Sequence, residues 1–260
     1  MEPPKRINVL GVGISEIDPP LALEHVRHAI ATRTKGYVTV TGVHGVSECQ
    51  EDEALRDLHN RSFLSTPDGM PMVWIGWLEG SDVIRRVYGP DMMLDVVKAG
   101  VAQGWRHFLY GGGPGLAERV KANLETRFPG VQVVGTYTPP FRPLNEAEEA
   151  ELTAMVAAAR PDCFWVGLST PKQERFMASY LPKLDATLMF GVGAAFDLNT
   201  GTVPQAPKFL QRIGLEWLYR LVKEPRRLWK RYLKNNPLFI ARFLLQRTGL
   251  RRYPEVPNQL

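Results

Sequence analysis

The side chains best suited to chemistry lie in two short runs of this chain. The first, Val-Gly-Leu-Ser-Thr-Pro-Lys-Gln-Glu at 166–174, closes an apolar stretch typical of a buried strand. Its Ser-Thr-Pro is expected to cap and open a helix, which puts Lys172 and Gln173 in the first turn. Open α/β sheets bind ligands at such carboxyl ends of strands. The second run, Pro-Asp-Gly, places a lone carboxylate, Asp68, on a turn. A helix start that carries a cation and an amide suits binding of a nucleotide-linked substrate. The separate carboxylate suits the role of a base.

Strand-like and helix-like patterns alternate through the first 207 residues. Strands are expected over residues 7–12, 37–41, 105–110, 131–137, 162–168 and 186–190. Helices are expected over residues 19–30, 47–60, 91–103, 116–128 and 146–159, the last capped by Asn145. Strands separated by helices imply an α/β fold, here a Rossmann-like, mostly parallel sheet with helices on both faces.

The last fifth of the chain differs in charge and in pattern. Residues 208–260 hold 13 Lys or Arg against 3 acids, a net of +10, whereas residues 1–207 hold 19 basic and 24 acidic residues. Only helical patterns occur here, over 208–223 and 226–247, with breaks expected at Pro225 and Pro237. The sequence therefore predicts a domain over 1–207 and a basic helical appendage over 208–260. Basic and aromatic residues interleave in this appendage, which fits an interfacial helix on an anionic membrane. The alternative is a packed helical cap with a solvated basic face.

Two further segments follow expected strands. Gly111, Gly112 and Gly113 lie between a strand and a helix, where glycines let backbone N–H groups approach a phosphate. A tight turn without a ligand explains them nearly as well. Asp197 follows the last strand and has the chemistry to hold a ribose or sugar hydroxyl, although a helix-capping role is equally consistent with its position.

No metal or cofactor is expected. The five histidines and two cysteines show no ligand spacing, and Asp-x-Asp does not occur in the chain. An enzyme that handles a sugar diphosphate without a metal site would have to neutralise the leaving phosphates with Lys, Arg and helix dipoles. The first residues lack the apolar core of a signal peptide, and we expect no membrane-spanning helix.

Taken together, these motifs resemble the WecG/TagA/CpsF family of glycosyltransferases, glycosyltransferase family 26, from about residue 7 to about residue 240. The resemblance is carried by 66–70 (Thr-Pro-Asp-Gly-Met), 87–91 (Val-Tyr-Gly-Pro-Asp), 111–115 (Gly-Gly-Gly-Pro-Gly), 139–142 (Pro-Pro-Phe-Arg), 166–174, 191–197, 214–221 (Gly-Leu-Glu-Trp-Leu-Tyr-Arg-Leu) and 224–227 (Glu-Pro-Arg-Arg).

The resemblance implies transfer of a sugar, N-acetylmannosamine or a related hexose, from a UDP donor to a polyprenyl-diphosphate-linked sugar, with inversion and without metal. Such reactions build teichoic acid linkage units, enterobacterial common antigen, capsule or exopolysaccharide. The family's catalytic base maps to Asp68 and its substrate-contacting glutamine to Gln173. Appendage arginines that complete the family's site map to Arg220 and Arg227, and a third falls on Lys230.

One position departs from the family's pattern. Many members carry Thr-x-Asn after the second strand, where this chain has Thr39 and Thr41. A threonine lacks the amide's paired donor and acceptor, so these two residues are expected to line the sugar site without fixing N-acetylmannosamine as the donor.

The sequence leaves two other classes open. A nicotinamide-dependent oxidoreductase uses the same kind of sheet, but this chain lacks Gly-x-Gly-x-x-Gly. A nucleic-acid-binding protein would use the basic tail, but the tail's apolar and aromatic residues favour a membrane, so no nucleic-acid partner is expected. The leading interpretation is a glycosyltransferase peripheral to the cytoplasmic face of a bacterial membrane. The oligomeric state, including a homo-oligomer, stays open.

Overall fold

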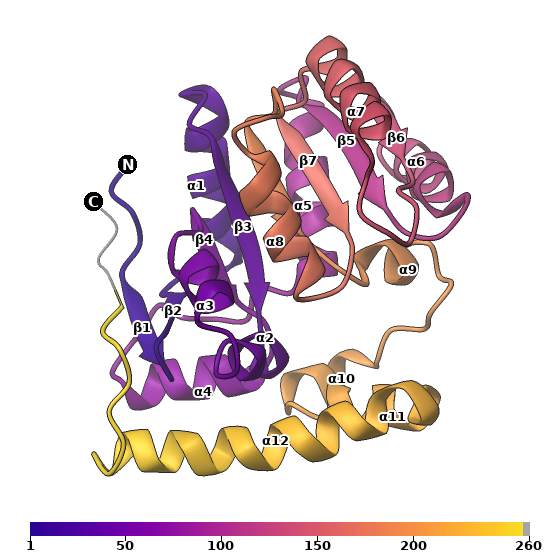
Figure 1. The fold of residues 1–260 in the computed structure, drawn as a ribbon. Helices are drawn as coiled ribbons and strands as arrows, with labels where there is room; N and C mark the ends of the chain where they lie inside the picture. The colour runs from indigo at the N-terminus through magenta and orange to yellow at the C-terminus, as the bar shows by residue number, and fades with distance from the viewer. Residues whose placement is uncertain (257–260) are drawn as a thin grey trace. The chain divides into compact units, whose positions relative to one another are not determined.

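The structure, a computed structural model, describes residues 1–256 apart from the side chain of Arg227. Its main sheet has six strands in the order β4-β3-β8-β7-β5-β6 (Figure 1). The strands are β3 Gly36–Thr41, β4 Leu64–Pro67, β5 Arg106–Gly111, β6 Gln132–Tyr137, β7 Cys163–Gly167 and β8 Leu188–Gly191. From β3 to β6 each strand pairs with its neighbour in parallel. The predicted Rossmann-like α/β class is confirmed.

The chain divides into two compact units. Unit 1 comprises residue 1, residues 20–39 and residues 89–204, and unit 2 comprises residues 2–19, 40–88 and 205–260. The basic appendage therefore groups with two segments from the first third of the chain. The division predicted from sequence, into 1–207 and 208–260, stays a prediction.

Unit 1 has helices on both faces of its strands. Helices α7 (Glu146–Ala159) and α8 (Lys172–Tyr180) cover the face that carries Phe108 and Phe164, whose rings stack at 5.1 Å. The opposite face carries His107, against which α5 (Gly89–Val101) packs at Gly100. Figure 1 shows α8 in front of the strands and α5 behind them. The remaining helices of this unit are α1 (Pro19–Ala31), α6 (Leu116–Arg127) and α9 (Ala195–Asn199).

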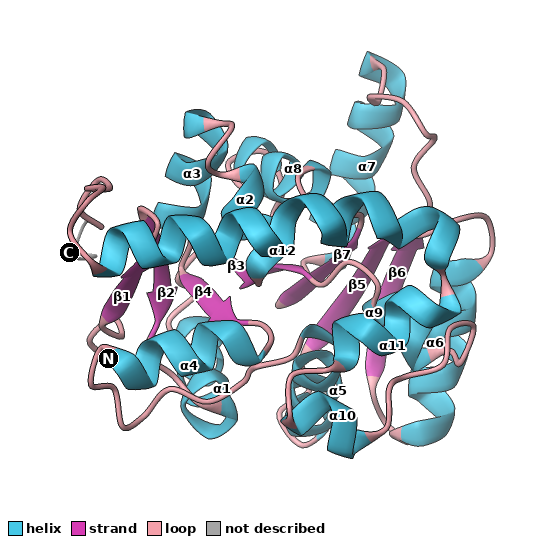
Figure 2. Cartoon of the chain, turned by 90° about the horizontal axis from the view of Figure 1, so that it is seen from below, coloured by secondary structure: helices cyan, strands magenta, loops and turns pink. Residues whose placement is uncertain are grey.

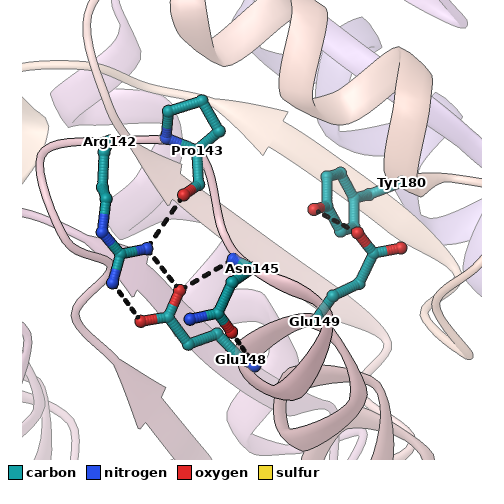
Figure 3. Close-up of polar contacts among 6 residues, drawn as sticks. All are labelled: Arg142, Pro143, Asn145, Glu148, Glu149 and Tyr180. Atoms are coloured by element: carbon teal, nitrogen blue, oxygen red, sulfur yellow. Dashed lines mark hydrogen bonds and ion pairs between the residues drawn. The ribbon is translucent and has the colours of Figure 1, made fainter.

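The start of α7 confirms the cap expected at Asn145. The Asn145 side chain accepts from the Glu148 backbone N–H at 2.9 Å, and the Glu148 carboxylate accepts from the Asn145 N–H at 2.9 Å (Figure 3). Arg142 donates to both oxygens of Glu148 at 2.7 and 2.8 Å. This pairing, with the backbone bond from Asn145, lowers the pKa of Glu148 to about 2. Arg142 of the Pro-Pro-Phe-Arg motif thus closes the loop before α7 onto its capping box.

Unit 2 begins with a hairpin, so the single strand expected over 7–12 is wrong. Strands β1 (Arg6–Val9) and β2 (Val12–Ser15) pair antiparallel. Leu10 and Gly11 turn the chain with φ of 54° and 82°. Two consecutive residues at positive φ make the tight turn that matches the twist of a hairpin. The apolar run hid this turn because Leu10 is an unusual residue there.

The single helix expected over 47–60 is also wrong, because the chain forms two. Helix α2 spans Val43–Glu48 and α3 spans Glu53–Asn60. Asp52 starts α3 by accepting from the Leu55 backbone N–H at 2.9 Å, a strong N-cap that competes with a continuous helix. Helix α4 (Met70–Leu78) follows the Pro-Asp-Gly turn.

The described part of the appendage forms three helices, α10 (Lys208–Arg212), α11 (Glu216–Lys223) and α12 (Pro225–Arg247), so the single helix expected over 208–223 is wrong. The break expected at Pro237 is wrong, since this residue lies inside α12. Pro237 is exposed, and Leu228 and Phe239, buried on either side of it, hold the helix to the unit. Because α11 and α12 are separate helices (Figure 2), their basic residues do not continue along one helical face.

Candidate functional site

The Pro-Asp-Gly turn of unit 2 lies between a strand and a helix. Its strand, β4, ends at Pro67, and the Asp68 backbone N–H donates to the Thr41 carbonyl at 3.0 Å. Gly69, with φ of 89°, is the N-cap residue of α4. A side chain would be strained at that φ, which explains the glycine. Half-buried Asp68 thus sits between the end of β4 and the first turn of α4.

Within the same unit, the Arg220 guanidinium interacts electrostatically with the Asp68 carboxylate. Burial lowers the Arg220 pKa, but interactions with Tyr232, Tyr88 and the carboxylates Glu216 and Asp68 outweigh it and raise the pKa overall. The guanidinium is therefore a fixed cation. Residues predicted from separate motifs, at positions 68 and 220, are brought to one place.

Tyr88 and Glu216 belong to the same cluster and were not singled out from the sequence. The Tyr88 hydroxyl hydrogen-bonds Glu216, and burial, with the charges of Glu216 and Asp68, raises its pKa. Tyr88 is therefore neutral and keeps its proton. Both residues lie inside quoted motifs, Val-Tyr-Gly-Pro-Asp and Gly-Leu-Glu-Trp, so a signal was present, but only their spatial pairing reveals their role.

Arg86 joins this cluster from the segment that precedes Tyr88. Its guanidinium pairs with Glu216, donates to Gln211 Oε1 at 2.9 Å and lies 4.1 Å from the centroid of the Tyr88 ring. The side chains of Arg86 and Glu216 are only 14% and 15% exposed. Glu216 and Arg220 are one turn apart on α11, so the ion pair fixes the helix that carries Arg220.

Thr41 has a buried hydroxyl. It accepts from Ser65 Oγ at 3.0 Å and pairs with His59 Nδ1 at 3.1 Å. Burial, with the nearby charge of Arg6, lowers the pKa of His59 to about 4, so the imidazole is neutral. The network links the end of β3 to β4 and α3. The sugar-binding role of Thr41 stays a prediction.

The second predicted motif lies in unit 1, at the start of α8. Neither Ser169 nor Thr170 caps the helix with its side chain, contrary to expectation, since α8 has Pro171 as N-cap and no side-chain cap bond. The Thr170 hydroxyl donates instead to Glu174 Oε1 at 2.9 Å. Lys172 is the first residue of α8 and is exposed.

Gln173 and Glu174 are both buried beside this turn. The Gln173 amide nitrogen donates to Glu174 Oε1 at 3.0 Å and to the Gly191 carbonyl at 3.2 Å. The Gln173 carbonyl oxygen has no hydrogen-bond partner within the described part of the chain. Burial raises the pKa of Glu174. With its N–H groups engaged, Gln173 has only an acceptor left to offer.

Two different local features explain why glycine occupies these positions in the loop after β5. A Cβ at Gly111 (φ 119°) would lie 2.7 Å from the Gly167 backbone, and one at Gly112 would lie 2.9 Å from Leu116, so both glycines are needed for packing. A Cβ at Gly113 would meet nothing within 4 Å. Of the three candidates Gly111, Gly112 and Gly113, Gly113 therefore has open space for an approaching ligand, as does Gly115 at the end of the loop.

The remaining candidates occupy defined places. Thr39 is buried in β3, opposite Gly191 of β8. Asp197 is half-buried inside α9, whose N-cap is Ala194, so it does not cap that helix. In the appendage, Lys230 is exposed and lies 5.6 Å from the centroid of the Trp229 ring. The role predicted for Arg227 depends on its side chain, which the structure does not describe.

Metal coordination and membrane crossing each have a structural requirement. Among residues 1–256, no group of three or more His, Cys, Asp or Glu side chains is placed to hold a metal ion. In the same part of the chain, no helix combines the length and the apolar character that crossing a bilayer requires.

Comparison with known proteins identifies a family model and relatives to which this chain is similar. The model of the glycosyl transferase WecG/TagA/CpsF family matches residues 7–253. A Bacillus spizizenii protein named N-acetylglucosaminyldiphosphoundecaprenol N-acetyl-beta-D-mannosaminyltransferase is 27% identical over 230 residues, covering 88% of this chain and 86% of its own. A protein of the same name from Bacillus subtilis strain 168 is 29% identical over 184 residues, covering 70% and 69%.

Proposed function

Because this chain belongs to the WecG/TagA/CpsF family and is a glycosyltransferase, we propose that it moves a hexose from a UDP-sugar to a polyprenyl-diphosphate-linked sugar. Both Bacillus relatives carry names that specify N-acetylmannosamine transfer to N-acetylglucosaminyldiphosphoundecaprenol. The proposed donor sugar is N-acetylmannosamine or a close relative. The reaction inverts the anomeric centre and needs no metal ion.

The observation that carries this mechanism is the cluster of Asp68, Arg220 and Tyr88 in unit 2. Asp68 acts as the general base that removes the proton from the acceptor hydroxyl as the oxygen attacks the anomeric carbon. The carboxylate sits at the end of a strand, the usual position for catalytic groups in open sheets. Tyr88, neutral because of its raised pKa, does not compete for that proton.

Cationic side chains neutralise the departing diphosphate in this mechanism. Arg220 is supported in this role by its raised pKa and by its proximity to Asp68. Arg227 and Lys230 add positive charge from α12. Lys230 presents a point charge where the family pattern has an arginine, so it cannot grip two phosphate oxygens at once.

Gln173 is proposed to accept a hydrogen bond from the substrate. Its amide N–H groups are already bonded to Glu174 and Gly191, so its free oxygen accepts from a hydroxyl or an N–H. We expect it to orient the sugar or nucleoside, while Gly113 and Lys172 approach the phosphates. Thr39 and Asp197 are proposed as further substrate-binding residues of unit 1, and Thr41 as a substrate-binding residue of unit 2.

The enzyme is proposed to work on the cytoplasmic face of the membrane, where its lipid-linked acceptor lies. The appendage supports this through its net charge of +10 and its exposed aromatic residues.

A product assay tests the proposal. The protein is incubated with a panel of UDP-sugars and a short-chain lipid diphosphate carrying N-acetylglucosamine, and the products are identified by mass spectrometry. One added hexosyl mass, with release of UDP, is expected. If UDP is released but none of the donors in the panel gives a new glycoside, the assignment is contradicted.

A further inference from the structure

Helix α4 of unit 2 presents large apolar side chains to solvent. Trp74, Trp77 and Leu78, at positions i, i+3 and i+4, are 42%, 49% and 57% exposed, whereas Met72 and Ile75 are buried. An outward face of this size needs a reason, because soluble surfaces seldom gather two tryptophans on nine residues.

Helix α12 carries a matching stripe. Trp229, Leu233, Ile240 and Leu244 are all exposed, with Leu233 at 65%. Their spacings of four, seven and four residues confine them to an arc of roughly 60° on a helix with 3.6 residues per turn. These four side chains therefore share one side of α12, whereas Leu238 and Leu245, which are also exposed, lie farther round the helix.

The two faces lie next to each other within unit 2. Figures 1 and 2 both show α4 beside α12. Phe239 of α12 shares a buried cluster with Met72 and Ile75 of α4, and Arg247 lies 3.5 Å from Glu79 at the end of α4. The outward side chains of both helices thus border one surface.

The α12 side of this surface is basic, and two of its cations are paired, Arg247 with Glu79 and Lys234 with Glu51. Helix α12 holds seven Lys or Arg and no Asp or Glu. Tryptophan and leucine flanked by basic side chains are the composition that suits the interface of an anionic bilayer. A second copy of the chain is a poorer occupant, because a symmetric contact would set the basic α12 helices against each other.

We propose that α4 and α12 together form a membrane-binding surface, in which Trp74, Trp77 and Leu78 of α4 enter the headgroup region of an anionic bilayer. The inference rests on the proposed function, which gives membrane binding to the appendage alone. It adds a second element from outside the appendage.

This placement has a consequence for the reaction. Helix α4 starts two residues after Asp68 and is about 13 Å long at 1.5 Å per residue. A bilayer that holds Leu78 therefore keeps the proposed base within about that distance of the headgroups. The diphosphate of a lipid-linked acceptor emerges at the same level. Contact through α4 would present the acceptor sugar to Asp68 without extracting the lipid.

Site-specific fluorescence tests the inference. Cys49 and Cys163 are fully buried, so an environment-sensitive dye attaches selectively to Leu78→Cys, to Leu233→Cys on α12, or to Phe141→Cys, a 91% exposed control in unit 1. Each labelled full-length protein is mixed with vesicles of phosphatidylcholine and phosphatidylglycerol. The dyes at 78 and 233 should shift to the blue, while the dye at 141 should not.

A variant measures the contribution of α4. Leu78→Ser should weaken vesicle partitioning about tenfold, because an apolar side chain no longer enters the lipid. Turnover on a short soluble acceptor should be unchanged, since Leu78 is not part of the site.

The outcomes separate the two proposals. A shift at 233 without one at 78 overturns the role of α4 and leaves the appendage as the membrane element. No shift at either position overturns the membrane assignment itself. A shift at 78 that grows with protein concentration in the absence of vesicles identifies a second copy as the occupant, and a shift at 141 as well indicates non-specific adsorption; both contradict the inference.

Discussion

Removing the Arg86 side chain should undock the helix that carries Arg220. Arg86 connects the segment between α4 and α5 to Glu216 of α11, 130 residues away. It also lies over the Tyr88 ring and holds Gln211. In Arg86→Ala the Glu216 carboxylate loses its ion-pair partner while it stays largely buried, and the hydrogen bond from Tyr88 remains.

The burial of the pair sets the size of the effect. Breaking a fully buried ion pair costs about 3–5 kcal/mol, whereas an exposed pair contributes roughly 0–1 kcal/mol. At 14% and 15% exposure, this pair lies between these limits, and a coupling of about 2 kcal/mol is expected. That corresponds to roughly a 30-fold loss of kcat/KM if the docked α11 is required for turnover.

A double-mutant cycle measures the coupling. Urea unfolding and kcat/KM are recorded for Arg86→Ala, Glu216→Ala and the double variant. The matched control is the pair of Lys121 and Glu125 on α6, 3.8 Å apart and 40% and 47% exposed, for which about 0.3 kcal/mol is expected. A coupling for the Arg86 pair no larger than that of the control would refute the positioning role.

Three further predictions concern metal, lipid and pH. Activity should persist in excess EDTA, since cationic side chains are proposed to neutralise the diphosphate; a complete loss that magnesium restores would contradict this. Neutralising Arg226→Gln and Lys234→Gln should weaken binding to anionic vesicles by roughly 2 kcal/mol in total, at about 1 kcal/mol per charge, and flotation in high salt should reproduce the effect. Burial holds the pKa values of His59 and His107 at about 4, so the unfolded chain takes up protons between pH 6.5 and pH 4 while the folded protein does not. The free energy of unfolding should therefore fall as the pH drops through that range, by about 2 kcal/mol per histidine at pH 5 in urea titrations, and His107→Asn should lose only about half as much as the unmodified protein.

Local patterns predicted those parts of the fold that local chemistry decides. The alternation of strands and helices predicted the sheet, and the Asn145 cap was predicted because Asn is a preferred N-cap residue and here precedes a helical pattern with acids in its first turns. The hairpin at Leu10 and the N-cap at Asp52 were missed because an apolar run and a helical period obscured single-residue turns.

In the candidate site, too, residues within local motifs could be predicted and residues that depend on distant contacts could not. Asp68, Gln173 and Arg220 were predicted because each stands in a recognisable motif. Arg86 was not, because its partner on α11 is 130 residues away and no sequence spacing encodes that contact. Gln173 was predicted as a substrate contact, but the donors already engaged by Glu174 and Gly191 show which of its atoms is left to make it.

The central claim is that Asp68 is the base of a sugar transfer from a UDP donor. The most direct measurement compares the protein and its Asp68→Asn variant for UDP binding by calorimetry and for glycoside formation with the best donor and a lipid-diphosphate acceptor. Asparagine keeps the size of the side chain but cannot take the proton, so turnover should fall by about 10²- to 10⁴-fold while UDP binding is retained. Full turnover in Asp68→Asn would contradict the account.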